Sequence, residues 1–132
     1  MPLELSPGPW VIGGDESAIP AIGTLLDALP DRATADVFIE AEDRDATMDT
    51  DDPINWLRRS GSSAPGSLLE AALTTTDIPA GARVWVACEA TAVRRIRRQL
   101  LEAGSVSPER LVTRGYWRAG EANHPDHDYG ED

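Results

Sequence analysis

Residues 83–104, RVWVACEATAVRRIRRQLLEAG, decide the fold that this sequence predicts. The first six residues, Arg83 to Cys88, form a short apolar run of the kind found in buried strands. From Glu89 the apolar residues recur at helical spacing, and Gly104 follows the last turn, where a glycine commonly ends a helix. A buried strand that leads directly into an amphipathic helix is a building block of parallel α/β sheets. The residues on the inner side of the predicted helix are Ala92, Val93, Ile96, Leu100 and Leu101.

The same alternation of strand and helix extends to both sides of this stretch. Residues 10–12 form a short apolar strand closed by two glycines, and the segment from Ile19 to Leu29 has one apolar helical face that Pro30 ends. Residues 36–41 form a second strand, whose Val-Phe-Ile centre we expect to be buried on both faces. The remaining predicted elements are a strand at 54–57, a short helix at 68–73 and a strand at 110–117.

This order predicts one α/β domain: a single five-stranded parallel sheet with helices on both faces. In such sheets the ligand lies beyond the carboxyl ends of the strands, near the point where the strand order reverses. We expect the first and fourth strands to flank that crevice. The domain spans residues 10–118, after a Pro-rich lead-in (1–9) and before an acidic tail (119–132) that we expect to be disordered.

Composition narrows the classes of partner. The chain has 132 residues and a formal net charge of -11, and its 12 basic residues are all arginine. Such a chain repels nucleic acid and anionic membranes, so we expect neither as a partner. Cys88 is the only cysteine, which excludes an internal disulfide, and the first residues show no signal peptide. We therefore expect a cytoplasmic protein.

The turn after the first strand is the first candidate site. Gly14 permits a tight turn and a close approach of a ligand, and the following helix N-terminus attracts anions. However, Asp15 and Glu16 would oppose a pyrophosphate, and Asp15 next to Ser17 also fits an ordinary helix N-cap. The residues alone leave both interpretations open.

Arg58 and Arg59, which end the third predicted strand, are the second candidate. Arginine suits bidentate binding of phosphate, such as the 2′-phosphate of an adenosine. The alternative is a pair of solvated charges that balance the acidic loop before them. A similar choice applies to four arginines of the later helix, which form either a solvated face or a docking face for an acidic partner: Arg94, Arg95, Arg97 and Arg98.

Cys88 and the tail offer weaker signals. A thiol at a strand end just before a helix can be reactive, but a small buried side chain is the simpler interpretation of Cys88. His124 and His127 lie in an HPDHD segment of the tail, which we interpret as part of a disordered acidic tail rather than as a metal site. No catalytic residue is assigned from the sequence.

Four segments together resemble the siderophore-interacting protein family, and WLRR (56–59) is similar to that family's Trp-Leu-His-Arg segment. The four are GDESAIPAI (14–22), DVFIEAED (36–43), WVACEATAVRRIRRQL (85–100) and RGYWRAGE (114–121). The resemblance covers Trp10 to Gly120 and lies in the family's C-terminal domain. It departs from the family at Arg58, where histidine is usual, and at Cys88, where glycine is usual.

The resemblance implies a nucleotide-binding domain of the ferredoxin-reductase type. In the family, an N-terminal barrel binds FAD, the C-terminal domain binds NAD(P)H, and the reduced flavin passes electrons to a ferric siderophore, which releases Fe(II). Here it implies NADPH or NADH as cofactor, without FAD on this chain. Gly14, Asp15, Glu16 and Ser17 would form the first turn of the site, and Arg58 and Arg59 would meet the adenosine phosphate. Cys88, Glu89 and Ala90 would line the nicotinamide side.

Two functional hypotheses follow from the resemblance. The first is a dinucleotide-binding module for ferric-siderophore reduction that works with a separate FAD-binding barrel protein and is not an enzyme by itself. The second is a non-catalytic relic, or a regulatory or interaction domain, that keeps the fold and forms a homodimer through an apolar edge.

Overall fold

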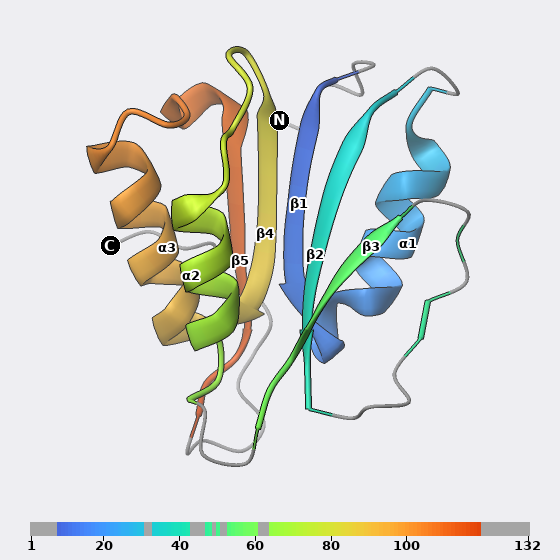
Figure 1. Cartoon of the computed structure of the whole chain (residues 1–132), viewed down its shortest axis with the longest axis vertical. Helices are drawn as coiled ribbons and strands as arrows, with labels where there is room; N and C mark the ends of the chain where they lie inside the picture. The colour runs from blue at the N-terminus through green and yellow to red at the C-terminus, as the bar shows by residue number, and fades with distance from the viewer. Residues whose placement is uncertain are drawn as a thin grey trace.

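Five parallel strands form one sheet, as the sequence predicts, and their order in the sheet is β3-β2-β1-β4-β5. The computed structural model describes residues 8–30, 33–42, 47–48, 50, 53–60 and 64–119. The strands are β1 (Trp10–Asp15), β2 (Ala35–Ala41), β3 (Ile54–Arg58), β4 (Arg83–Glu89) and β5 (Leu111–Trp117) (Figure 1). The lead-in to residue 7 and the tail from residue 120 lie outside the described residues, so the expectation of a disordered tail stays a prediction.

The strand order reverses at the centre of the sheet. β1 pairs with β2 on one side and with β4 on the other, and the chain continues outward from each of them. This arrangement confirms that the first and fourth strands lie side by side at the topological switch point. Because all strands are parallel, their carboxyl ends meet at one edge of the sheet, which we call the strand-end edge.

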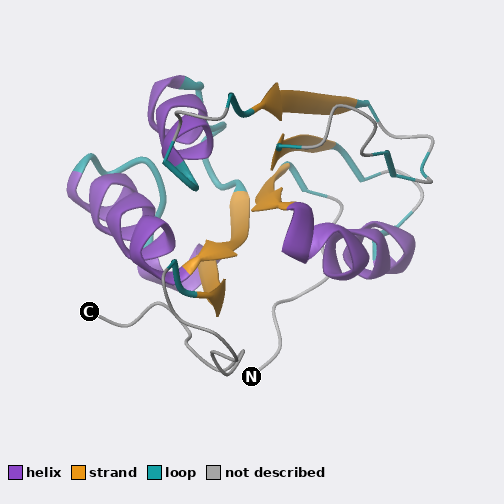
Figure 2. Ribbon diagram, turned by 90° about the horizontal axis from the view of Figure 1, so that it is seen from below, coloured by secondary structure: helices purple, strands orange, loops and turns teal. Residues whose placement is uncertain are grey.

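Helices pack on both faces of the sheet. The helix α1 (Ile19–Ala28), preceded by the short 3₁₀ turn η1 (Glu16–Ala18), covers one face. The helices α2 (Ser67–Thr75) and α3 (Ala90–Glu102) lie together on the other face (Figures 1 and 2). A second 3₁₀ turn, η2 (Pro108–Arg110), leads into β5. The apolar sequence pattern explains why α3 packs on the sheet, because the positions expected to face inward are buried: Ala92, Val93, Ile96 and Leu100, with Leu101 partly buried.

The first strand is longer than the sequence predicts, because it runs through Gly13 and Gly14 to Asp15. A side chain has no room at either glycine. A Cβ atom on Gly13 would lie 3.0 Å from a Leu73 methyl carbon, and one on Gly14 would lie 2.8 Å from the Ala18 Cβ. The two glycines therefore let helices from both faces pack directly on the β1 backbone, and the turn begins only at Asp15.

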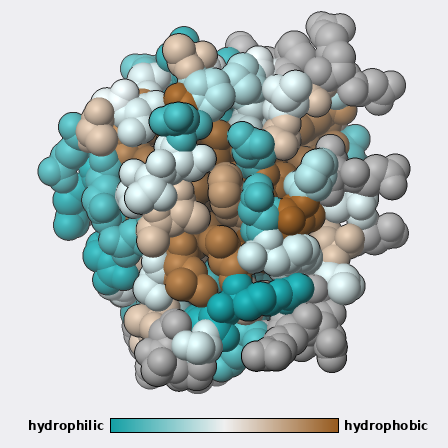
Figure 3. All heavy atoms as spheres, in the orientation of Figure 1, coloured by the Kyte–Doolittle hydropathy of each residue, from teal (hydrophilic) through white to brown (hydrophobic). Residues whose placement is uncertain are grey.

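The expectation that β2 is buried on both faces is wrong at Phe38. Val37 and Ile39 are fully buried beneath α1, whereas Phe38 on the opposite face is only partly buried, as is Leu57 of β3 beside it. The reason is that α3 packs over β4 and β5, and α2, which packs on β1 and β2, covers Phe38 and Leu57 only in part. Figure 3 shows hydrophobic atoms at the surface near the centre of this face.

The described helices are short. None of them is long and apolar enough to cross a lipid bilayer.

Candidate functional site at the strand-end edge

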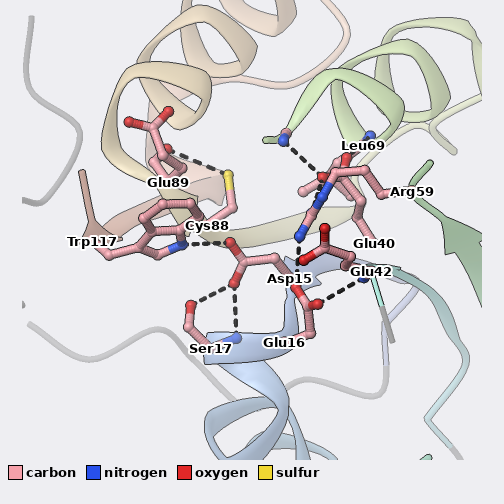
Figure 4. Close-up of polar contacts among 11 residues, drawn as sticks. Asp15, Glu16, Ser17, Glu40, Glu42, Arg59, Leu69, Cys88, Glu89 and Trp117 are labelled. Atoms are coloured by element: carbon pink, nitrogen blue, oxygen red, sulfur yellow. Dashed lines mark hydrogen bonds and ion pairs between the residues drawn. The ribbon is translucent and has the colours of Figure 1, made fainter. Parts of the chain in front are cut away.

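The strand-end edge collects the residues that the sequence singles out. Asp15 ends β1, Arg58 ends β3 and Glu89 ends β4, while Ser17 lies in η1 just after β1 and Arg59 directly follows β3. Figure 4 shows that Asp15, Glu16, Arg59, Cys88 and Glu89 lie near one another there, although they come from three different strands, β1, β3 and β4, and the residues that follow them. The topology thus assembles a polar cluster at the position where parallel α/β sheets bind ligands.

Asp15 has the role of a helix cap. Its carboxylate accepts a 3.0 Å hydrogen bond from the Ser17 amide and another from the Ser17 hydroxyl, so it caps η1 as the sequence suggests. The other carboxylate oxygen accepts a 2.8 Å bond from Nε1 of Trp117 at the end of β5. Burial raises the pKa of Asp15 above its ordinary value, and the bonds from Ser17 and Trp117 oppose that rise only in part.

Glu40 is the central residue that the sequence analysis missed. It ends the apolar stretch of β2, is fully buried, and accepts three hydrogen bonds. One comes from Nη1 of Arg59 at 2.6 Å, and the others come from the amides of Gly66 and Leu69 at 2.7 and 2.9 Å. Because these two amides belong to the first turn of α2, the Glu40 carboxylate fills the N-terminus of that helix. The available signal was a carboxylate directly after the apolar run Val37 to Ile39 of this strand.

Arg58 and Arg59 do not act as a pair. Arg59 is held inside the edge, where its guanidinium bonds Glu40 and lies 3.3 Å from a Glu16 carboxylate oxygen, and only 10% of its side chain is exposed. Arg58 points to the opposite face of the sheet, with its guanidinium carbon 4.6 Å from the centre of the Trp56 ring. Neighbouring residues of a strand face opposite ways, so the structure does not bring the two guanidinium groups to one site.

Glu16 closes this cluster on the solvent side. One of its carboxylate oxygens accepts a 2.7 Å hydrogen bond from the Glu42 amide, and the other pairs with Arg59. Burial alone would raise the pKa of Glu16, but the Glu42 bond and the Arg59 charge hold that pKa below its ordinary value. Glu16 is therefore a stably charged group of the cluster.

Glu89 fills the N-terminus of α3. Its Oε1 accepts a 2.9 Å hydrogen bond from the Ala92 amide, and its Oε2 accepts a 3.1 Å bond from the Ala119 amide after β5. These bonds outweigh the effect of partial burial and lower the pKa of Glu89. Ala90, the first residue of α3, is fully buried and presents only a methyl group.

Cys88 is a buried core residue. It has no exposed surface and packs in the apolar cluster beneath α2 and α3. Burial raises the pKa of its thiol well above the ordinary value, and the charges of Asp15, Glu40 and Glu89 raise it further. The thiol therefore stays protonated and unreactive at neutral pH, which favours the interpretation as a small buried side chain.

The edge as a whole does not fit a bound phosphate. Each of the three helical segments that begin there, η1, α2 and α3, has a buried carboxylate of this chain at its N-terminus: Asp15, Glu40 and Glu89. Phosphates of dinucleotides bind at just such helix ends. The one guanidinium within the cluster, that of Arg59, is already paired with two carboxylates. Among the described residues, no group of three or more histidine, cysteine, aspartate or glutamate side chains is arranged so that it could hold a metal ion either.

Comparison with known proteins identifies the group to which this chain is related. The family model of the siderophore-interacting proteins matches residues 9–120. The chain belongs to the siderophore-interacting protein family. This assignment confirms the resemblance that the five sequence segments carry.

Named relatives of the family act on different siderophores. The chain is 29% identical to the ferric vibriobactin reductase of Vibrio cholerae, over 94% of this chain and 48% of that protein. It is 27% identical to the ferric acinetobactin reductase of Acinetobacter baumannii, over 83% of this chain and 40% of that protein. The chain therefore spans about half the length of the curated relatives it matches, or somewhat less.

Solved structures agree with the fold. A siderophore utilization protein from T. fusca matches with a TM-score of 0.76 and 36% identity, over 96% of this chain and 50% of that chain. The siderophore-interacting protein from A. baumannii matches with a TM-score of 0.71 and 26% identity, over 88% of this chain and 48% of that chain. In both comparisons, this chain superposes on about half of a protein that is twice as long.

Proposed function

We propose that this chain acts in siderophore-dependent iron reduction, as the α/β domain that pairs with an FAD-binding barrel. The observation that carries the proposal is the family match across residues 9–120. Relatives named as ferric vibriobactin and ferric acinetobactin reductases support the reaction class. The half of each relative that this chain does not match leaves room for a flavin domain in the complete reductase.

The proposed division of labour gives the flavin to the barrel partner. FAD, when bound there, supplies the electrons that reduce the ferric siderophore. This chain would contribute its strand-end edge as the surface next to the flavin, with Arg59 and the carboxylates around it held rigid by their mutual bonds. NADPH or NADH, which the family resemblance implies as donor, would have to bind without phosphate contacts to the helix N-termini.

Reconstitution tests this function. The half of the T. fusca protein that this chain does not match would be purified with FAD. Its flavin would be photoreduced with EDTA as the electron donor before a ferric siderophore is added. We expect this chain to bind that half and to raise the rate at which Fe(II) is released and trapped by a ferrous chelator. An unrelated acidic protein of similar size is the control. No binding and no acceleration would contradict the proposal.

A second candidate is an interaction domain without redox activity, which forms complexes or homodimers. The three carboxylates at the helix N-termini favour it, because they remove the usual anion-binding groups from the edge. Here the chain would bind the flavin half, or itself, without changing the rate of iron release. Sedimentation together with the rate measurement separates the two candidates.

A further inference from the structure

We propose that the strand-end edge of this chain excludes the phosphate groups of a dinucleotide, because the chain's own carboxylates occupy the helix N-termini where those phosphates would bind. The inference goes beyond the proposed function and does not depend on it, since iron reduction could receive its electrons through the flavin partner alone. The inference concerns the backbone amides at three helix N-termini and the three carboxylates that accept hydrogen bonds from them.

The N-terminus of α2 is the most completely occupied. The amides of Gly66 and Leu69 both donate to the Glu40 carboxylate, and Arg59 donates to it from the other side. Helix amides and a guanidinium are the groups that would otherwise hold a phosphate. Glu40 is fully buried, so its carboxylate cannot move aside into water without breaking all three bonds.

The N-termini of η1 and α3, the helical segments that follow the two central strands β1 and β4, are occupied in the same way. After β1, the Asp15 carboxylate accepts a hydrogen bond from the Ser17 amide, and after β4 the Glu89 carboxylate accepts one from the Ala92 amide. Each carboxylate also accepts a second bond from the end of β5 or just after it. The Trp117 indole donates to Asp15, and the Ala119 amide donates to Glu89. The switch point, where β1 and β4 end side by side, is therefore flanked by two buried carboxylates, and each of them is held by bonds from two segments of the chain.

Electrostatics acts in the same direction. Asp15, Glu16, Glu40 and Glu89 surround the edge, and the guanidinium of Arg59 is shared between Glu16 and Glu40. The lowered pKa values of Glu16 and Glu89 keep both groups charged at neutral pH. A pyrophosphate would therefore enter a site of its own sign, where weak dielectric screening strengthens the repulsion.

Binding measurements on the purified chain test the inference. Inorganic pyrophosphate and NADPH are titrated into the wild type and into Glu89→Gly. This variant removes the carboxylate from the amides at the N-terminus of α3, and glycine is a residue that helices accept at the N-cap position. We expect the wild type to bind pyrophosphate with a Kd above about 1 mM and Glu89→Gly to bind it at least about tenfold more tightly. Glu89→Gln fills the same space without charge and should fall between them.

The control is Glu109→Gly, which removes an exposed carboxylate from η2, ahead of β5, and changes the net charge equally. It should bind as the wild type does, and melting curves establish that every variant is folded. Asp15→Asn replaces Glu89→Gly if that variant is unfolded. Wild-type binding of pyrophosphate below about 0.1 mM, or NADPH binding that pyrophosphate displaces, overturns the inference. Folded variants that gain no affinity overturn it too, because the carboxylates would then not be the barrier.

Discussion

Trp117 donates a 2.8 Å hydrogen bond from its indole nitrogen to the carboxylate of Asp15, across 102 residues of sequence. The bond joins the ends of β1 and β5, which are not neighbours in the sheet because β4 lies between them. Asp15 is 2% exposed, so this bond satisfies a charge that water cannot reach. It ties the outer strand β5 to the centre of the edge.

Replacing that indole tests its contribution. Trp117→Phe keeps an aromatic ring and removes the donor, which leaves one oxygen of a buried carboxylate without its partner. We expect a loss of about 1–3 kcal/mol in the free energy of unfolding, measured by urea denaturation at neutral pH. Trp56→Phe is the matched control, since the Trp56 ring contacts Arg58 by its face and should cost less than about 1 kcal/mol. Equal losses in both variants would mean that the Asp15 bond is not the cause.

The sequence predicted the sheet because every strand and helix carries its own local pattern. The cap at Asp15 was also predictable, since Ser17 lies two residues away. Glu40 was not, because its partners Gly66 and Leu69 lie 26 and 29 residues further on and only the crossover to α2 brings them close. Adjacent Arg58 and Arg59 suggested one site, although the alternation of side chains along a strand directs them to opposite faces.

The Glu40–Arg59 pair should be far more important for stability than an exposed pair. Glu40→Gln leaves the Arg59 charge buried without its main partner and weakens the cap of α2, so we expect a loss of about 3–5 kcal/mol in the free energy of unfolding. The comparison is Glu70→Gln, which breaks the exposed Glu70–Arg95 pair at 3.0 Å and should cost about 1 kcal/mol or less. Denaturant titrations of both variants provide the measurement.

A double-mutant cycle separates pairing from burial. If the two groups interact directly, Glu40→Gln combined with Arg59→Met should be less destabilised than the sum of the single variants, because neither charge is then buried alone. Additive losses would show that Glu40 acts mainly through the α2 amides rather than through Arg59.

Arg58 and Arg59 should respond differently to replacement. Arg59→Ala removes a buried guanidinium that neutralises Glu40 and Glu16, whereas Arg58→Ala removes a partly exposed contact with Trp56. We expect Arg59→Ala to lower the melting temperature clearly and Arg58→Ala to change it little, as expected for a cation–π contact of about 0.5–1 kcal/mol. Differential scanning calorimetry of the two variants decides the point, and equal effects would contradict the observed division of roles.

Asp15 and Glu89 should shift the pH dependence of stability in opposite directions. The folded pKa of Glu89 lies below its ordinary value of 4.5, so its contribution is present above about pH 4.5 and is lost as the pH falls through the lowered folded pKa. The folded pKa of Asp15 lies above its ordinary value of 3.8, so the fold binds this proton more readily, and Asp15 favours folding increasingly as the pH falls toward 3.8.

Two variants make the opposite signs visible in denaturation curves measured between pH 3 and pH 7. Glu89→Gln should be less stable than the wild type at pH 7, and the difference should shrink as the pH falls, because protonation removes the same charge from the wild type. As the pH falls from 7 toward 3.8, the free energy of unfolding of Asp15→Asn should decrease relative to that of the wild type, because only the wild type is stabilised by protonation of a buried carboxylate at this position. Parallel curves for all three proteins would show that neither carboxylate titrates differently in the folded and unfolded states, and the charged arrangement at the strand-end edge would then need revision.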